Sequence, residues 1–271
     1  MDETGALLAA VQFAGHKAID AIFTPLSHDV EAAVLRQAVP DQRGVLRLSL
    51  PSRATILTAI GHLIDNARVL LMRTILGSVR EAEAAAAVGA AVVPPRDLGA
   101  AITATGTIWR SLGTDRPSVI GQTGALLVRG IAAGAPATEV ARTVKQYFSP
   151  FFAPRRDENG KLLRADRQGA VRSWPGRAGM ASQHARTVML TETTAAHTRS
   201  QLRIALYGDQ LMQYTVSRQH KDADVCSDLA KADSGFGPGV YEPRNAPMVP
   251  RHPRCRCFYT RVDRPVRRNS A

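Results

Sequence analysis

The sequence predicts a mainly α-helical protein that ends in a small C-terminal α+β module. Three observations lead to this prediction. Apolar residues recur every three or four positions through much of the first 150 residues, which is typical of amphipathic helices. Aromatic residues make up only 5% of the 271 residues, so aliphatic helix packing must supply most of the core. All three cysteines fall between positions 226 and 257, which marks the C-terminal part as a distinct module.

The first 150 residues predict a bundle of helices. The longest candidate spans 52–90, because apolar side chains recur along one stripe of it, and Pro94 and Pro95 follow it. The stripe consists of Ile56, Ile60, Leu63, Ala67, Leu70 and Thr74. The other helices are expected at 3–23, 28–38, 96–112, 117–133 and 136–148. We therefore interpret 1–150 as one helical domain.

A basic arm or linker is expected at 151–179, where the helical periodicity disappears. Glycine, proline and asparagine supply turn chemistry there, and Asn159–Gly160 favours the tip of a hairpin. The arginines of this segment that we single out are Arg155, Arg156, Arg164, Arg167 and Arg172. A solvated linker and a functional arm are equally compatible with this composition.

The C-terminal module is expected at 180–271. A helix is predicted at 180–207, and the alternation of Met212, Tyr214 and Val216 with polar residues predicts a strand. Glycine and proline are dense from 233 to 254, which predicts an irregular loop. A last strand is expected at 258–262 and a loose tail after it.

The positive charge lies in the second half of the chain. Residues 1–139 contain 12 basic and 12 acidic residues, whereas 140–271 contain 23 basic and 11 acidic ones. A basic field attracts polyanions, and double-stranded DNA is the commonest of these, although an anionic membrane surface or an acidic protein would also fit. We expect phosphate or an acidic partner to be contacted, without sequence readout, by the arm arginines together with Arg264, Arg267 and Arg268.

The sequence gives no signal for export or for membrane insertion. It begins Met-Asp-Glu, and no uninterrupted apolar segment approaches the roughly 18 to 20 residues of a bilayer span. Three cysteines crowded into one region also do not form a framework that staples a secreted domain. We therefore expect a soluble protein that is not secreted and does not contact a membrane.

The cysteines point to a local structural metal site. Cys226, His252, Cys255 and Cys257 form a Cys3His set of the kind that zinc prefers, with His220 as a competing imidazole. Cys255 and Cys257 are two residues apart, so an extended backbone directs both side chains the same way. A loop so poor in apolar residues gains most from a bound metal. A disulfide from Cys226 to Cys255 or Cys257, or plain packing of the thiols, are the alternatives.

The same region resembles the C-terminal signature of the Mu F-like phage head morphogenesis (minor head or minor capsid) protein family. The resemblance covers about 180–262 and depends on the order of several short motifs. These are Ala185-Arg186-Thr187, Thr191-Glu192-Thr193, Thr215-Val216-Ser217-Arg218, the segment from His220 to Ala230, Gly239-Val240-Tyr241 and His252-Pro253-Arg254-Cys255-Arg256-Cys257. Many members of the family have a tryptophan near the strand at 211–218, where this chain has Tyr214.

The resemblance implies a structural protein of a tailed double-stranded DNA phage. Such a protein is present in few copies near the portal vertex of the virion head and aids head assembly and DNA packaging or delivery. Its expected partners are the portal protein, the major capsid or scaffold protein, and packaged DNA bound without sequence preference. During assembly it would be found in the host cytoplasm. The N-terminal 180 residues add no recognisable motif, so a portal-docking or scaffold-contacting role for them follows from position alone.

Three other functions compete with a structural role. Asp222, Asp224 and His220 can be combined into a metal-dependent nuclease site, although the carboxylates also suit helix capping before Ser227. A zinc deaminase requires HxE and PCxxC, whereas this chain has Asp222 and Pro253-Arg254-Cys255-Arg256-Cys257. A zinc-containing nucleic-acid-binding regulator would explain the charge but leaves the neutral helical half without a role. We therefore expect a structural protein and no catalytic residues.

Overall fold

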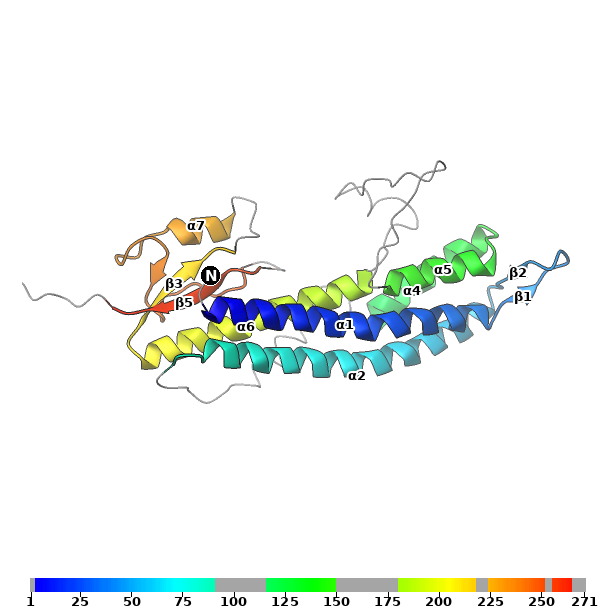
Figure 1. The fold of residues 1–271 in the computed structure, drawn as a ribbon. Coiled ribbons are helices and arrows are strands. Elements are labelled where there is room, and N and C mark those ends of the chain that lie inside the picture. Colours follow the sequence, from blue (N-terminus) through cyan, green and yellow to red (C-terminus); the bar gives the residue numbers. More distant parts are fainter. Residues whose placement is uncertain (1–2, 91–115, 150–179, 218–223, 252–254, 265–271) are drawn as a thin grey trace, which may run out of the picture. The chain divides into compact units, whose positions relative to one another are not determined.

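The computed structural model describes residues 3–90, 116–149, 180–217, 224–251 and 255–264 (Figure 1). Over these residues the protein is mostly helical, with a small sheet region and a cysteine cluster near the C-terminus, as the sequence predicts. The chain forms two compact units. Unit 1 comprises Met1–His16, Thr74–Ile108 and Thr187–Ala271, and unit 2 comprises Lys17–Arg73 and Trp109–Arg186.

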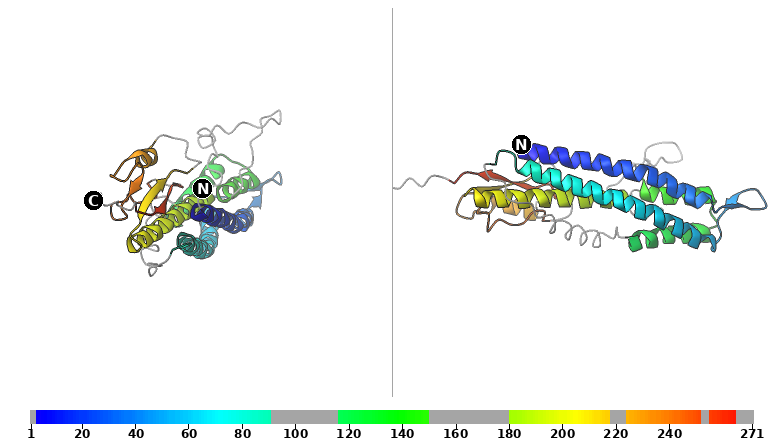
Figure 2. Two further views of the ribbon diagram at one scale, coloured as in Figure 1. Left: turned by 60° about the vertical axis from the view of Figure 1, so that its left-hand side comes forward. Right: turned by 90° about the horizontal axis from the view of Figure 1, so that it is seen from below.

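Unit 2 is built from helices. It contains most of α1 (Glu3–Leu35), the first part of α2 (Ser52–Ala86), α4 (Arg116–Ala132) and α5 (Ala137–Phe148). Helices α4 and α5 lie side by side (Figures 1 and 2), and Gly130 lets Val140 approach the α4 backbone closely. The buried side chains Tyr147 and Phe148 at the end of α5 contact each other edge to face. These contacts form part of the core of the unit, together with buried aliphatic side chains of α1 and α2.

A short hairpin follows α1 that the sequence did not predict. Strands β1 (Val39–Pro40) and β2 (Leu46–Arg47) pair antiparallel. The Asp41 carboxylate closes the turn by accepting hydrogen bonds from the amides of Arg43 and Val45, at 2.8 and 3.0 Å. Those two bonds also lower the pKa of Asp41.

Unit 1 combines helix and sheet. Strand β3 (Leu211–Thr215) lies at the centre of a three-stranded antiparallel sheet, between β4 (Val240–Tyr241) and β5 (Phe258–Val262). In the register of β3 and β5, Tyr214 pairs with Tyr259. The short helix α7 (Val225–Lys231) contacts β3. The sheet and α7 thus form the small module that carries the cysteines.

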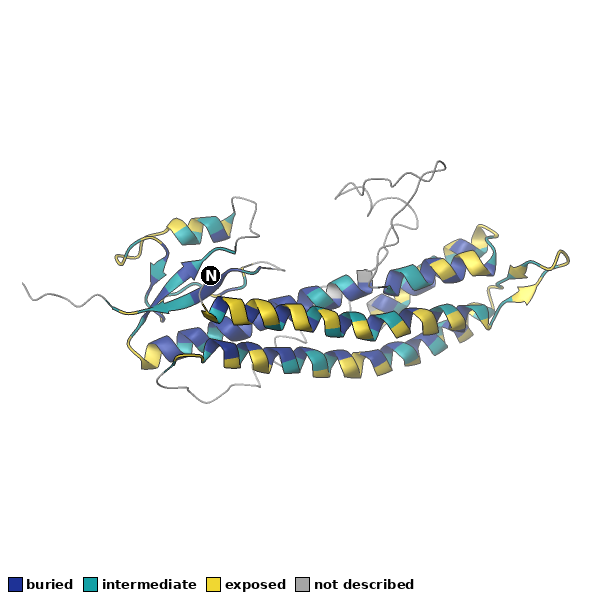
Figure 3. Cartoon of the chain, in the orientation of Figure 1, coloured by how far each residue is buried: buried dark blue, intermediate teal, exposed yellow. Residues whose placement is uncertain are grey.

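Helix α6 (Met180–Tyr207) is buried along most of its length, whereas α1 and α2 each keep an exposed face (Figure 3). The buried side chains of α6 are unusually polar. Among its side chains that are at most 8% exposed are Thr191, Glu192, Thr193, Thr194, His197, Thr198 and Gln201. Buried polar groups need partners, so this helix places hydrogen-bonding groups inside unit 1.

The predicted break between helices at 3–23 and 28–38 is wrong, because α1 runs unbroken from Glu3 to Leu35 with Pro25 inside it. Proline removes one helical hydrogen bond. Two side chains bond to backbone carbonyls around it: Thr24 Oγ1 donates to the Asp20 carbonyl and Ser27 Oγ to the Thr24 carbonyl, both at 2.8 Å. A continuous buried stripe on both sides of the proline holds the helix together. It consists of Ile19, Phe23, Leu26, Val30 and Val34.

Several sequence predictions are confirmed. The helices expected at 52–90, 117–133, 136–148 and 180–207 correspond to α2, α4, α5 and α6, and the last strand has the predicted bounds. The loop expected at 233–254 contains strand β4, which was missed. The helix at 96–112, the arm at 151–179 with its hairpin tip, and the tail beyond Arg264 lie outside the described residues. The domain division at 1–150, 151–179 and 180–271 stays a prediction.

Two helices, α1 and α2, are long and apolar enough to cross a bilayer by length and composition alone. Charged residues such as Lys17 and Asp20 in α1 and Arg68 and Arg73 in α2 interrupt these helices, so the sequence contains no uninterrupted apolar run of that length. Core helices of soluble proteins and signal sequences satisfy the same criterion. The expectation of no membrane contact therefore stays a prediction.

Two glycines of α4, Gly121 and Gly130, differ in the space around them, because only Gly130 is approached closely by α5. A Cβ at Gly130 would lie 2.7 Å from Val140 Cγ2, whereas a Cβ at Gly121 would meet nothing within 4 Å. We expect Gly130→Ala to lower the free energy of unfolding by about 1–3 kcal/mol through overpacking. Gly121→Ala should raise it by about 0.5–1 kcal/mol, because alanine favours the helix. Urea unfolding of both variants measures the difference, and equal effects would contradict the close approach.

Candidate metal centre

Cys226 is positioned by the capped start of α7. The Asp224 side chain is the N-cap of this helix and accepts hydrogen bonds from the amides of Cys226, at 2.8 Å, and Ser227, at 3.4 Å. An aspartate cap satisfies amides that the helix leaves without partners. The cap therefore holds the first turn of α7 in place, and with it Cys226, the second residue of the helix, which is fully buried.

Cys255 and Cys257 are positioned by the segment that leads into β5. Pairing of β5 with β3 aligns Phe258 with Thr215, which holds Cys257 beside the sheet. The Thr194 hydroxyl on α6 lies 3.1 Å from the Cys255 carbonyl and 2.8 Å from the Leu190 carbonyl, so it can donate to either. Gln12 Nε2 on α1 donates to the Thr194 hydroxyl at 3.1 Å. Helices α1 and α6 thus support the Cys255 backbone.

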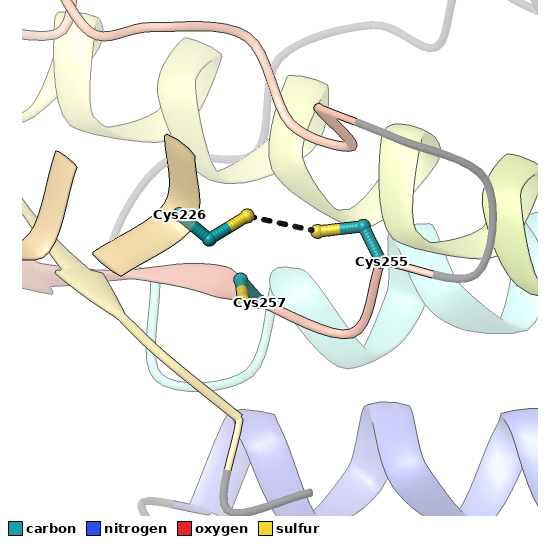
Figure 4. A group of neighbouring side chains, drawn as sticks. All are labelled: Cys226, Cys255 and Cys257. Atoms are coloured by element: carbon teal, nitrogen blue, oxygen red, sulfur yellow. Dashed lines mark hydrogen bonds between the residues drawn. The ribbon is translucent and has the colours of Figure 1, made fainter. Parts of the chain in front are cut away.

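The three thiols converge in one buried place (Figure 4). Their Sγ atoms all lie within 4.8 Å of one another, and each residue is at most 1% exposed. Cys226 Sγ and Cys255 Sγ lie 3.7 Å apart, and no disulfide joins the three residues. Two thiolates bound tetrahedrally to zinc at about 2.3 Å lie about 3.8 Å apart. The cluster is therefore a group of three cysteines that could hold a metal ion.

The surroundings of the thiols are apolar but contain hydrogen-bond donors. The three cysteines belong to a buried cluster whose other members include Leu202, Met212 and Val249. Backbone hydrogen bonds from Arg251 and Cys257 reach the Cys255 side chain, and one from Ser217 reaches Cys257. Amide donors at sulfur stabilise thiolates, which are the form of cysteine that binds metals.

The three thiols differ in acidity. The hydrogen bond from Cys255 lowers the pKa of Cys257 to about 5, and the bond from the Ser217 amide adds to this effect. The same bond raises the pKa of Cys255, and burial raises it further. Burial raises the pKa of Cys226. Of the three thiols, Cys257 is therefore the one that most favours the thiolate form.

Tyr214 completes the inner surface of the cluster. It is 2% exposed, and its hydroxyl interacts with the side chains of Cys226 and Cys257. Burial raises the pKa of this hydroxyl, and the two thiols raise it further. The phenol therefore stays protonated and remains a hydrogen-bond donor.

The other predicted site residues have different positions. His220, Asp222 and His252 lie outside the described residues, so a fourth ligand stays a prediction. Among the arginines proposed to contact phosphate, only Arg264 is described, and it forms ion pairs with Asp209 at 2.9 Å and Glu242 at 3.1 Å. Arg155, Arg156, Arg164, Arg167, Arg172, Arg267 and Arg268 also lie outside the described residues.

Sequence reasoning missed the residues that surround the cysteines. Thr194 directly follows the Thr191-Glu192-Thr193 motif, and a polar run in the middle of a helix would have indicated buried hydrogen bonds. Tyr214 alternates with Gln213 and Thr215 in the predicted strand, so its place on the buried face could have been found from that alternation.

No family model, curated protein or solved structure matches this chain in the comparisons with known proteins.

The unequal acidity of the thiols predicts a specific titration of the metal-free protein. A single thiolate should form with a midpoint near pH 5, visible in the ultraviolet absorbance, and Cys257→Ser should abolish it. Because the folded pKa lies below the unfolded value of about 8.5, Cys257 stabilises the fold fully above pH 8.5. This stabilisation is lost as the pH falls towards 5, so the stability difference between wild type and Cys257→Ser should shrink over that range. Titration of all thiols above pH 8 would refute the assignment.

Proposed function

We propose that this chain is a structural minor head protein of a tailed double-stranded DNA bacteriophage. We further propose that its cysteine cluster is a structural zinc centre that closes the C-terminal module. The convergence of Cys226 with Cys255 and Cys257 carries the proposal. These residues belong to the motifs on which the resemblance to the Mu F-like family depends, and in the sequence they lie about thirty positions apart.

The distances and chemistry of the cluster support a metal over simple packing of thiols. The 3.7 Å separation of Cys226 Sγ and Cys255 Sγ fits two ligands of one tetrahedral ion. Amide bonds to Cys255 and Cys257 would stabilise the thiolate form that the ion requires. His252, with His220 as the alternative, would supply the fourth ligand.

Such a centre would have a structural role, which is to stabilise the fold of the C-terminal module. It would join α7 to the segment before β5, across a loop with few apolar residues. A structural ion contributes its binding free energy directly to folding, which suits a module with a three-stranded sheet and one short helix. In this proposal a helical N-terminal bundle and a basic arm precede the metal-closed module, and the bundle would dock to the portal, major capsid or scaffold protein.

A nuclease is less well supported. Asp224, one of the two carboxylates in that hypothesis, is the N-cap of α7 and accepts two amide hydrogen bonds. A carboxylate in this role has less capacity to bind a catalytic cation. A zinc-containing nucleic-acid-binding regulator remains the second alternative, since the basic arm would serve either protein.

The metal centre predicts a loss of zinc in single variants of the full chain. Wild type should retain about one zinc ion per chain by elemental analysis, and Cys226→Ser, Cys255→Ser or Cys257→Ser should lose most of it. His252→Ala should weaken retention if it is the fourth ligand, whereas His62→Ala, an exposed histidine of α2, should not. Zinc at a thousandfold excess over its dissociation constant should stabilise the fold by about 4 kcal/mol. Zinc-free wild type with unchanged stability in chelator would refute the centre.

The place of the protein in a virion is tested separately. Mass spectrometry of intact phage particles should detect the chain in few copies, and it should co-purify with the portal protein. A nucleic-acid-binding regulator would be found in infected cells but not in washed particles. Absence from particles would refute the structural role and leave the metal centre unaffected.

A further inference from the structure

Tyr214 differs from the other two buried tyrosines of the cysteine core. The Tyr241 hydroxyl donates to the Leu229 carbonyl at 2.6 Å, and the Tyr259 hydroxyl donates to the Pro247 carbonyl at 2.9 Å. The Tyr214 hydroxyl is also buried, but it forms no hydrogen bond of ordinary geometry to the residues that the structure describes. A buried hydroxyl without a good acceptor costs stability, on the order of 1–3 kcal/mol.

The fold directs this hydroxyl at the thiols. Tyr214 lies on the central strand β3 opposite Tyr259, and the two rings contact each other with centroids 5.3 Å apart. Tyr259 is itself held by its bond to Pro247, so the Tyr214 ring has a fixed neighbour. Tyr214 belongs to the same buried cluster as Cys226 and Cys257, and these two thiols raise the pKa of its hydroxyl. A thiol is a weak acceptor, whereas a thiolate on a metal is a strong one.

We propose that Tyr214 is a positioning residue of the metal centre, whose hydroxyl donates to the metal-bound thiolates of Cys226 and Cys257. This inference depends on the proposed metal centre. Three thiolates around a divalent cation carry a net charge of −1 in an apolar core, and a hydroxyl dipole directed at sulfur offsets that charge. Groups that hydrogen-bond to metal ligands in this way typically change metal affinity by 10–100-fold.

The inference predicts a larger effect of Tyr214→Phe with metal than without it. In the metal-free protein the substitution removes a hydroxyl that forms no hydrogen bond of ordinary geometry to the described residues, so stability should change little. In the metal-bound protein it removes a donor from two thiolates, so affinity should fall. A residue that only fills space would not show this fall, because phenylalanine keeps the ring.

The experiment uses the full chain loaded with cobalt(II), whose thiolate charge-transfer bands report on the sulfurs, and zinc(II) competition against a chelator. Tyr214→Phe should bind one ion with about 10–100-fold lower affinity, and its charge-transfer bands should move to lower energy. Tyr259→Phe is the matched control. It should lower stability in both forms, because the Pro247 carbonyl loses its donor, and leave the bands in place.

Each outcome bears on a different claim. Equal affinity and equal band positions in wild type and Tyr214→Phe would refute the role of Tyr214 and leave the metal centre standing. A wild-type chain that binds neither ion would refute the metal centre and the inference with it. A Tyr214→Phe chain that loses its fold without metal would also overturn the inference, because the role of the hydroxyl would then not depend on the metal.

Discussion

The C-terminal module depends on bringing three thiols together without water. Cys226 lies on a seven-residue helix, and Cys255 and Cys257 lie on the approach to an edge strand, so neither segment has enough apolar surface to hold its position alone. The cysteines occupy the middle of the core that joins these segments, together with Tyr214, Tyr241 and Tyr259. The thiol groups of the three cysteines thus pack the core and are also its most reactive groups. Any ion, oxidant or proton that reaches the thiols acts directly on the contacts that hold the module.

Helix α6 provides the rigid support for this arrangement. Its buried threonines mostly return their hydroxyl bonds to the helix itself, as Thr191 does to Thr187 and Thr193 to Met189. Thr194 is different, because its hydroxyl also lies within reach of the Cys255 carbonyl and accepts from Gln12. His197 on the same helix contacts the ring of Phe258 edge to face. The helix therefore contacts the chain on both sides of Cys257, at the Cys255 carbonyl through a hydroxyl and at Phe258 through a ring.

The sequence was sufficient for elements with a strong local signal. Long periodic segments gave α2 and α6, alternation gave β3, and the bounds of β5 agree with the structure. The apolar stripe of α2 was predicted at Leu70 and Thr74, whereas the buried positions are Leu71 and Ile75, because a straight helix drifts relative to a seven-residue repeat. The continuity of α1 through Pro25 and the short strand β4 depend on tertiary contacts, which local preferences do not contain. The spacing of the cysteines was enough to predict their cluster. For Tyr214 the sequence offered only the alternation of a strand, which does not indicate that its side chain lies beside the thiols.

The contact of Leu8 with Ala82 and Phe258 in one buried cluster has a consequence for how the protein is made. The first helix leaves the ribosome long before the strand that covers part of its inner face has been translated. During that interval the nascent chain keeps Leu8, Gln12 and the surrounding apolar surface without their final partners, a state open to wrong association or to a chaperone. The final packing of unit 1 can therefore form only after the residues of β5 have been synthesised.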